Sequence, residues 1–140
     1  MKKSDNNSSK YQQALLIDEN EIDNFINERM ITSCNFAERV IVKNSGPAAL
    51  EYLKQVLANK ETLPEIIFLD LNMPVMDGFG FLEEFDIIFK EYGNIKEDCK
   101  IIVLSSSISP VDIDRASTNP YVYKYINKPL SEKYLDAINI

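Results

Sequence analysis

The 140-residue sequence contains no histidine, no tryptophan and only two cysteines. Without histidine, the chain itself cannot contain a Ser-His or Cys-His pair, a histidine-ligated zinc site or a phosphorylated histidine. Cys34 and Cys99 are far apart in the sequence. We interpret them as reduced cysteines packed as small hydrophobic residues, rather than as a disulfide or a metal site. Any bound metal would therefore be a hard cation held by oxygen atoms.

Long hydrophobic runs and an excess of basic charge are also absent. No apolar segment approaches the roughly 20 residues that a membrane-spanning helix needs. Residues 1–10 are polar, which excludes a secretory signal and predicts a disordered tail. Acidic residues outnumber basic ones by 22 to 15 with no basic cluster, so we do not expect direct nucleic-acid binding. At 45% hydrophobic residues, the chain fits one compact domain, which we place at residues 11–140 in the cytoplasm.

The most informative segment is the apolar run Ile66–Leu69, which leads directly into Asp70. Turn-forming residues at Asn72, Pro74 and Gly78 then prevent the strand from continuing. A short apolar run with such limits is typical of a strand buried on both faces of a parallel sheet. Asp70 would then lie at the carboxyl end of a central strand, where open α/β sheets bind ligands. A carboxylate there is costly unless it has a partner.

Strand-like and helix-like segments alternate five times along the chain. Right-handed crossovers then predict an α/β fold with a five-stranded parallel sheet, helices on both faces and the strand order 2-1-3-4-5. Ser45 is a candidate helix cap, with Pro47 in the first turn. The first helix is predicted to be amphipathic, with Ile22, Phe25, Ile26 and Met30 on its apolar face. The predicted strands are 14–17, 39–43, 66–69, 100–104 and 121–127, and the later helices start near 45, 78, 109 and 131, with the last reaching 140.

Polar residues recur where the predicted strands end: Asp18 and Glu19, then Asp70, Ser105 and Lys128. The carboxyl ends of parallel strands share one edge of the sheet, so these residues should lie together. Three carboxylates there repel one another, and their pKa values should rise unless cations intervene. Lys128 supplies one cation, and a magnesium ion bound by carboxylates would supply another. Ser105 has no base to activate it, so the nucleophile would be a carboxylate, whose attack on phosphorus gives an aspartyl phosphate.

These residues occur in four motifs, in order along nearly the whole chain beyond the tail: Leu16-Ile17-Asp18-Glu19, Asp70-Leu71-Asn72-Met73-Pro74-Val75-Met76-Asp77-Gly78, Ile102-Val103-Leu104-Ser105-Ser106, and Tyr125-Ile126-Asn127-Lys128-Pro129. In these motifs the sequence resembles the receiver domain of two-component response regulators, the flavodoxin-like fold of the chemotaxis regulators. The block from Asp70 to Gly78 is highly specific. The Lys-Pro pair is weak alone but strong at its place in the order.

The resemblance implies a role for each acidic residue. Asp70 would be the phosphoryl acceptor. Asp18 and Glu19 would hold Mg²⁺, with Asp70 and the backbone carbonyl of Asn72 completing the protein ligands. The family often has two aspartates where this chain has Asp18 and Glu19.

The resemblance also assigns the residues after the later strands. Lys128 would pair with the phosphoryl oxygens, and the Lys128-Pro129 peptide bond would be cis. Ser105, where the family often has threonine, would bind the phosphoryl group, and Tyr125 would be the aromatic switch that turns inward with it.

The implied function is that of a stand-alone receiver that catalyses only its own phosphorylation and dephosphorylation. Its donor would be a phosphohistidine on a sensor histidine kinase or a histidine phosphotransfer protein, and its output would be contact with a downstream protein of unknown identity. Three other interpretations compete with this one. A degenerate receiver would lack the acid, hydroxyl and lysine set found here. An aspartate-nucleophile hydrolase of the haloacid dehalogenase type normally has a second acid where this chain has Asn72. A flavin or nucleotide binder would have a glycine-rich loop after the first strand.

Several residues near these motifs have a plainer interpretation. Asp77 precedes the third helix and is better interpreted as its cap than as a ligand. Period-two alternation puts Tyr121, Tyr123 and Tyr125 on one side of the last strand; we expect the first two to be packing residues. Phe81, Phe85 and Phe89 are expected in the core.

Overall fold

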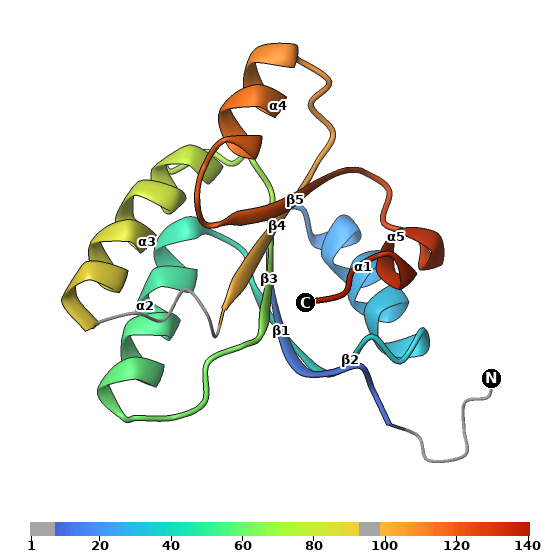
Figure 1. The fold of residues 1–140 in the computed structure, drawn as a ribbon, viewed down its shortest axis with the longest axis horizontal. Helices are drawn as coiled ribbons and strands as arrows, with labels where there is room; N and C mark the ends of the chain where they lie inside the picture. The colour runs from blue at the N-terminus through green and yellow to red at the C-terminus, as the bar shows by residue number, and fades with distance from the viewer. Residues whose placement is uncertain (1–7, 93–98) are drawn as a thin grey trace.

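Five strands and five helices alternate along the chain (Figure 1). The computed structural model describes residues 8–92 and 99–140. The elements in chain order are β1 (Tyr11–Ile17), α1 (Glu21–Ser33), β2 (Ala37–Lys43), α2 (Gly46–Ala58), β3 (Ile66–Leu69), α3 (Gly78–Tyr92), β4 (Lys100–Ser105), α4 (Pro110–Ser117), β5 (Val122–Asn127) and α5 (Glu132–Asp136).

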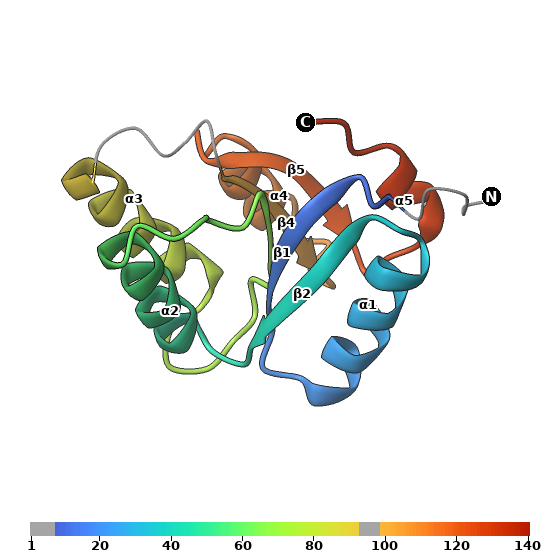
Figure 2. The ribbon, with the colours of Figure 1, turned by 90° about the horizontal axis from the view of Figure 1, so that it is seen from below.

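The strands form one parallel sheet in the order β2-β1-β3-β4-β5, as predicted. Helices α2 and α3 lie on one side of the sheet, and α1 and α5 on the other (Figures 1 and 2). Helix α4 packs against the edge strand β5. In each parallel crossover the helix leads back across a sheet face, so all five strands end at the same edge.

The core lies in two layers because side chains alternate across the central strands. Leu15 and Ile67 face α2 and α3, whereas Leu16 and Phe68 face α1 and α5. All four residues of β3 are buried, which confirms the prediction of a strand covered on both faces. No helix in the described ranges combines the length and hydrophobicity needed to cross a bilayer.

Most of the helices start after a residue whose side chain accepts a hydrogen bond from a backbone N–H of the first turn. The side chain of Ser45 accepts a hydrogen bond from the N–H of Ala48 at the start of α2, as predicted. Asp77 Oδ1 accepts from the N–H of Gly80 at 2.9 Å, which agrees with the cap interpretation. The strands β1 and β2 begin earlier than predicted, at Tyr11 and Ala37.

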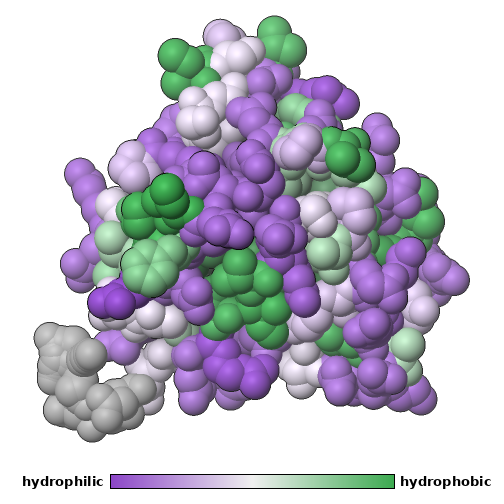
Figure 3. Space-filling model, turned by 180° about the vertical axis from the view of Figure 1, so that it is seen from behind, coloured by the Kyte–Doolittle hydropathy of each residue, from purple (hydrophilic) through white to green (hydrophobic). Residues whose placement is uncertain are grey.

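The prediction for the packing face of α1 is wrong for three of its four residues, and only Met30 packs against the core. Ile22, Phe25 and Ile26 are 70%, 62% and 49% exposed, while Asn24 and Asn27 are buried. The amide of Asn24 donates to the backbone carbonyl of Asp18 at 2.8 Å, which turns the polar side of the helix toward the sheet. The face of the molecule in Figure 3 shows that hydrophobic side chains reach the surface as separate patches among hydrophilic ones.

The last helix is shorter than predicted and ends at Asp136 rather than at residue 140. The residues after α5 contact the rest of the fold instead of extending the helix. Tyr123 donates its hydroxyl hydrogen to the carbonyl of Asn139, and the N–H of Ile140 donates to the hydroxyl of Tyr11. These contacts draw the end of the chain away from a helical path.

The aromatic predictions are confirmed for most residues. Phe81, Phe85 and Phe89 are buried in the α2–α3 layer. Tyr121 packs edge-on against Phe85 and Phe89. Tyr123, in contrast, is 47% exposed, so the expectation that it is a packing residue is wrong. The predicted end of the third helix at residues 93 and 94 and the predicted tail, apart from residues 8–10, lie outside the described residues.

Candidate functional site

The predicted site residues lie at the shared carboxyl edge of the sheet. Asp18 follows β1, Asp70 follows β3, Ser105 ends β4 and Lys128 follows β5. Backbone hydrogen bonds fix two of these positions: the N–H of Asp70 donates to the carbonyl of Ile17 at 3.0 Å, and the N–H of Lys128 donates to that of Ser105 at 2.9 Å. Residues from four different strands are therefore held next to one another by the sheet itself.

Lys128 is at the centre of the cluster. Its Nζ lies 2.7 Å from Asp18 Oδ2, 3.0 Å from Asp23 Oδ2 and 3.7 Å from Asp70 Oδ1. The lysine side chain is 16% exposed, so the pairs are only weakly screened by solvent. One ammonium group thus links carboxylates that follow two strands and one that belongs to α1.

Asp70 is in an environment that disfavours its charge. Its side chain is 6% exposed, and its Oδ1 is a buried atom without a hydrogen-bond partner. Burial, followed by the charge of Asp18, raises the pKa of Asp70 to about 6, against the opposing effects of Lys128 and of the backbone N–H groups of Asn72 and Leu71. The pKa of this carboxylate is raised as predicted, although burial contributes more to the rise than the predicted repulsion between carboxylates.

The pKa of Lys128 is raised, which favours the charged form of its side chain. Burial alone would lower the pKa of Lys128, but hydrogen bonds to Asp18 and Asp23 and the charge of Asp70 outweigh it and raise the pKa. The ammonium is therefore held as a permanent positive charge at the edge of the sheet.

The two acids of the predicted Asp18-Glu19 pair differ in their exposure. Asp18 is 2% exposed, and its Oδ1 accepts the N–H of Asn20 at 3.0 Å. The side chains of Glu19 and Asn72 are exposed. The prediction of Asp18 and Asp70 within one cluster is therefore confirmed, whereas the Glu19 side chain lies in solvent.

The hydroxyl and aromatic residues form a second group beside the first. Ser105 is fully buried, and its Oγ accepts the N–H of Ser107 at 3.1 Å. Tyr125 donates its hydroxyl hydrogen to the carbonyl oxygen of Ser107 at 2.8 Å, and the amide of Asn127 donates to the same oxygen at 3.1 Å. This group joins the loop after β4 to strand β5.

The turn after Asp70 explains the glycine of the motif. The N–H of Gly78 donates to the carbonyl of Leu71 at 2.9 Å. A Cβ atom at residue 78 would lie 2.8 Å from the carbonyl oxygen of Asp70 and from two atoms of Leu71. The start of α3 therefore packs directly on the backbone of the turn after Asp70, and only glycine fits there. The Lys128-Pro129 peptide bond is cis, as expected.

The donor set of the edge is suited to a hard cation such as Mg²⁺. The unpartnered Oδ1 of Asp70 and the carboxylate of Asp18 offer anionic oxygen atoms, the ligand type that Mg²⁺ prefers. Among residues 8–92 and 99–140, no three acidic, cysteine or histidine side chains are grouped so that they could hold a metal as they stand. Mg²⁺ usually takes one or two protein carboxylates and keeps several waters.

The sequence analysis missed Asp23. It was not among the predicted site residues, yet its carboxylate contacts Lys128. The available clue was its place in the first turn of a helix that follows the acid pair, since such a residue lies at the same edge of the sheet.

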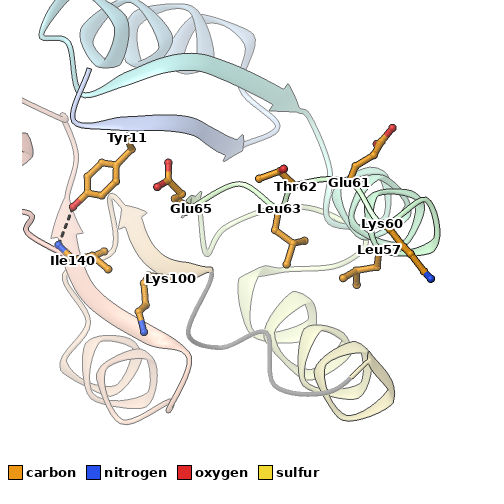
Figure 4. A pocket seen from close by; sticks show the side chains of 9 residues that line it. All are labelled: Tyr11, Leu57, Lys60, Glu61, Thr62, Leu63, Glu65, Lys100 and Ile140. Atoms are coloured by element: carbon orange, nitrogen blue, oxygen red, sulfur yellow. Dashed lines mark hydrogen bonds between the residues drawn. The ribbon is translucent and has the colours of Figure 1, made fainter. Parts of the chain in front are cut away.

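A well-formed cavity lies away from this edge of the sheet. It measures about 560 Å³ and lies at the amino ends of the strands, where Tyr11, Glu65, Lys100 and Ile140 line it (Figure 4). It contains none of the predicted site residues. We therefore place the site by the cluster of charged groups and not by cavity volume.

An open parallel α/β sheet with buried acids and a lysine at its carboxyl edge is the arrangement expected of a receiver domain. The response regulator receiver domain family matches residues 14–139, and the chain belongs to that family.

The chain is 31% identical over 117 residues to the probable methanogenesis regulatory protein FilR2 of Methanothrix harundinacea, covering 84% of this chain and 72% of that protein. A two-component response regulator of Cytophaga hutchinsonii has a solved structure that is 32% identical, with a TM-score of 0.81 and 89% and 91% of the two chains covered. The receiver domain of the histidine kinase CKI1 of Arabidopsis thaliana, solved with Mg²⁺ and BeF₃⁻, shares the fold at 22% identity, a TM-score of 0.68 and coverage of 87% and 81%.

The chain is thus a response regulator receiver domain, consistent with signalling by phosphorylation. Receiver domains generally bind Mg²⁺ and interact with histidine kinases or phosphotransfer proteins.

Proposed function

We propose that this receiver accepts a phosphoryl group on Asp70 from a phosphohistidine of a sensor kinase or phosphotransfer protein. The observation that carries the proposal is the position of Asp70: a buried carboxylate with an unpartnered oxygen, 3.7 Å from an ammonium group. No other nucleophile in the cluster has an activating base, because Ser105 donates to no base among the described residues and the chain has no histidine.

In the transfer, an Asp70 oxygen attacks phosphorus and forms a new P–O bond while the P–N bond to the donor imidazole breaks. The electron pair of that bond leaves with the imidazole. Asp70 must be ionised to attack. Its raised pKa opposes ionisation, whereas the Lys128 ammonium favours it. Phosphoryl transfer depends mainly on positioning and on neutralising charge.

Mg²⁺ would be held by Asp18, Glu19, Asp70 and the backbone carbonyl of Asn72. When bound, it would neutralise charge on the phosphoryl oxygens. Lys128 would pair with one phosphoryl oxygen, and Ser105 Oγ would donate to another after releasing the N–H of Ser107. A buried serine that now accepts a single backbone N–H retains its own hydroxyl hydrogen for this contact.

The signal would pass from Ser105 to Tyr125 through the loop that both contact. Ser107 contacts Ser105 with its N–H and Tyr125 with its carbonyl oxygen. A shift of Ser105 toward the phosphoryl group would therefore disturb the hydrogen bond that holds the Tyr125 ring. The altered surface of α4 and β5 would bind the downstream protein, and the chain would catalyse no reaction other than its own phosphorylation and dephosphorylation.

The test is incubation of the full chain with acetyl phosphate and Mg²⁺, followed by intact mass measurement. We expect a gain of one phosphoryl group in the wild type and in Asp77→Asn, and none in Asp70→Asn. Asp77 is the matched control because it is the other aspartate of the same motif and is exposed. Equal labelling of Asp70→Asn would refute the assignment, and no labelling of the wild type would favour a receiver that acts without phosphorylation.

A further inference from the structure

Asp23 makes a contact that the proposed phosphoryl chemistry does not require. It lies in the first turn of α1, and its Oδ2 is 3.0 Å from Lys128 Nζ. Its side chain is 38% exposed, so the pair lies at the solvent side of the cluster. The other two carboxylates near the ammonium, Asp18 and Asp70, are almost fully buried.

The contact does not serve as a helix cap. The cap of α1 is Asn20, whose side-chain oxygen accepts the backbone N–H of Asp23 at 2.9 Å. The carboxylate of Asp23 is therefore free to reach the ammonium. Glu21 occupies the same first turn, and it is an exposed acid with no cation paired to it in the described ranges.

The distances show where the ammonium is held. Two carboxylate oxygens, from Asp18 and Asp23, lie within hydrogen-bond distance of Lys128 Nζ, while Asp70 Oδ1 at 3.7 Å lies beyond it. An ammonium has three donors, and two of them are engaged on the α1 side. The third donor remains for a phosphoryl group at Asp70, but that group would have to draw the ammonium toward itself and away from the Asp23 carboxylate.

We propose that Asp23 is a positioning residue that restrains the Lys128 ammonium on the α1 side and so slows phosphoryl transfer to Asp70. The inference rests on the proposed function. The negative charge of Asp23 would also oppose the approach of a phosphodonor dianion to the edge of the sheet. Removing the carboxylate would free the lysine for the phosphoryl oxygens. The partly exposed position of Asp23 limits the effect to about two- to fivefold in rate.

The ion pair itself is tested in metal-free buffer by a double-mutant cycle. The variants are Asp23→Asn, Lys128→Met and the two combined, each of the full chain, with urea unfolding midpoints as the readout. A parallel cycle combines Glu21→Gln with Lys128→Met. We expect non-additive midpoint shifts for the Asp23 cycle and additive shifts for the Glu21 cycle. Additive shifts in both cycles would overturn the proposed restraint.

The functional consequence is tested by the initial rate of labelling with acetyl phosphate and Mg²⁺. We expect Asp23→Asn to be labelled about two- to fivefold faster than the wild type, and Asp23→Glu, which restores the carboxylate, to restore the slower rate. Glu21→Gln changes the net charge of the same helical turn equally and should not share the acceleration.

An unchanged or slower rate in Asp23→Asn, or an equal acceleration in Glu21→Gln, would overturn the inference. Labelling of the wild type separates this failure from a failure of the proposed function. If the wild type is not labelled, the proposed function falls and this inference falls with it, whatever the double-mutant cycle shows.

Discussion

Replacement of Asp70 by asparagine should stabilise the fold at neutral pH, although it removes the proposed acceptor. Asp70 is buried, and its pKa is raised from 3.8 to about 6. That difference of about two pKa units corresponds to about 3 kcal/mol, at about 1.4 kcal/mol per unit. Asparagine keeps the shape but not the charge, so it removes this cost while placing an amide beside Lys128. We therefore expect a net gain of about 1–3 kcal/mol in the free energy of unfolding.

The gain should depend on pH with a defined sign. Because the folded state binds this proton more tightly than the unfolded chain, ionisation of Asp70 destabilises the wild type as the pH rises from about 4 to above 6. The asparagine side chain of the variant does not titrate. The stability difference between the variant and the wild type should therefore be small at about pH 4, grow through that range and level off above about pH 7.

The assay is urea unfolding of the full chain at pH 4, 5, 6 and 7.5, with a chelator present to keep divalent cations from the carboxylates. Asp114→Asn on α4 is the control, because it removes an exposed aspartate of the same type. Its stability difference from the wild type should stay near zero at every pH. A destabilised Asp70→Asn at pH 7.5, or a gain that does not change with pH, would refute the electrostatic reasoning.

Two further pairs of substitutions test the packing around the site. Gly78→Ala should destabilise the fold by about 1–3 kcal/mol in urea unfolding, because its Cβ would meet the Asp70 and Leu71 backbone at 2.8 Å. Gly80→Ala should lose less stability, because its Cβ would meet the flexible Met76 side chain at 3.1 Å. Equal losses in the two variants would contradict the steric explanation. Ile31→Ala on α1 should lose about 2–5 kcal/mol since Ile31 is fully buried, whereas Ile26→Ala should change stability by less than about 0.5 kcal/mol, and a large loss at Ile26 would show that the α1 face is misassigned.

The sheet and most of the cluster were predictable from the sequence. The run Ile66–Leu69 has no polar residue that would place it on a surface, so its central position followed directly. Asp70, Ser105 and Lys128 each follow or end a strand, and parallel strands bring such residues to one edge. These predictions depend only on which residues follow a strand along the chain, and short sequence patterns indicate such positions well.

The orientation of α1 was not predictable in the same way. Apolar residues at Ile22, Phe25 and Ile26 satisfy the helical period, but the period does not say which face packs on the sheet. Polar contacts decide it here: Asn24 bonds the backbone of Asp18, and Asp23 reaches Lys128. Both partners lie outside the helix pattern, one of them by 105 positions in the sequence. The same long-range pairing is why Asp23 was missed.

The carbonyl oxygen of Ser107 receives hydrogen bonds from both Tyr125 and Asn127. These two donors are on β5, whereas the acceptor belongs to the loop that leads into α4. Movement of that loop must disturb the edge strand, since both donors share a single acceptor atom. The edge strand β5 and the loop before α4 are consequently coupled in both directions. A protein that binds at β5 would change the conformation of the Ser105–Ser107 loop by the same coupling free energy with which the loop changes binding at β5.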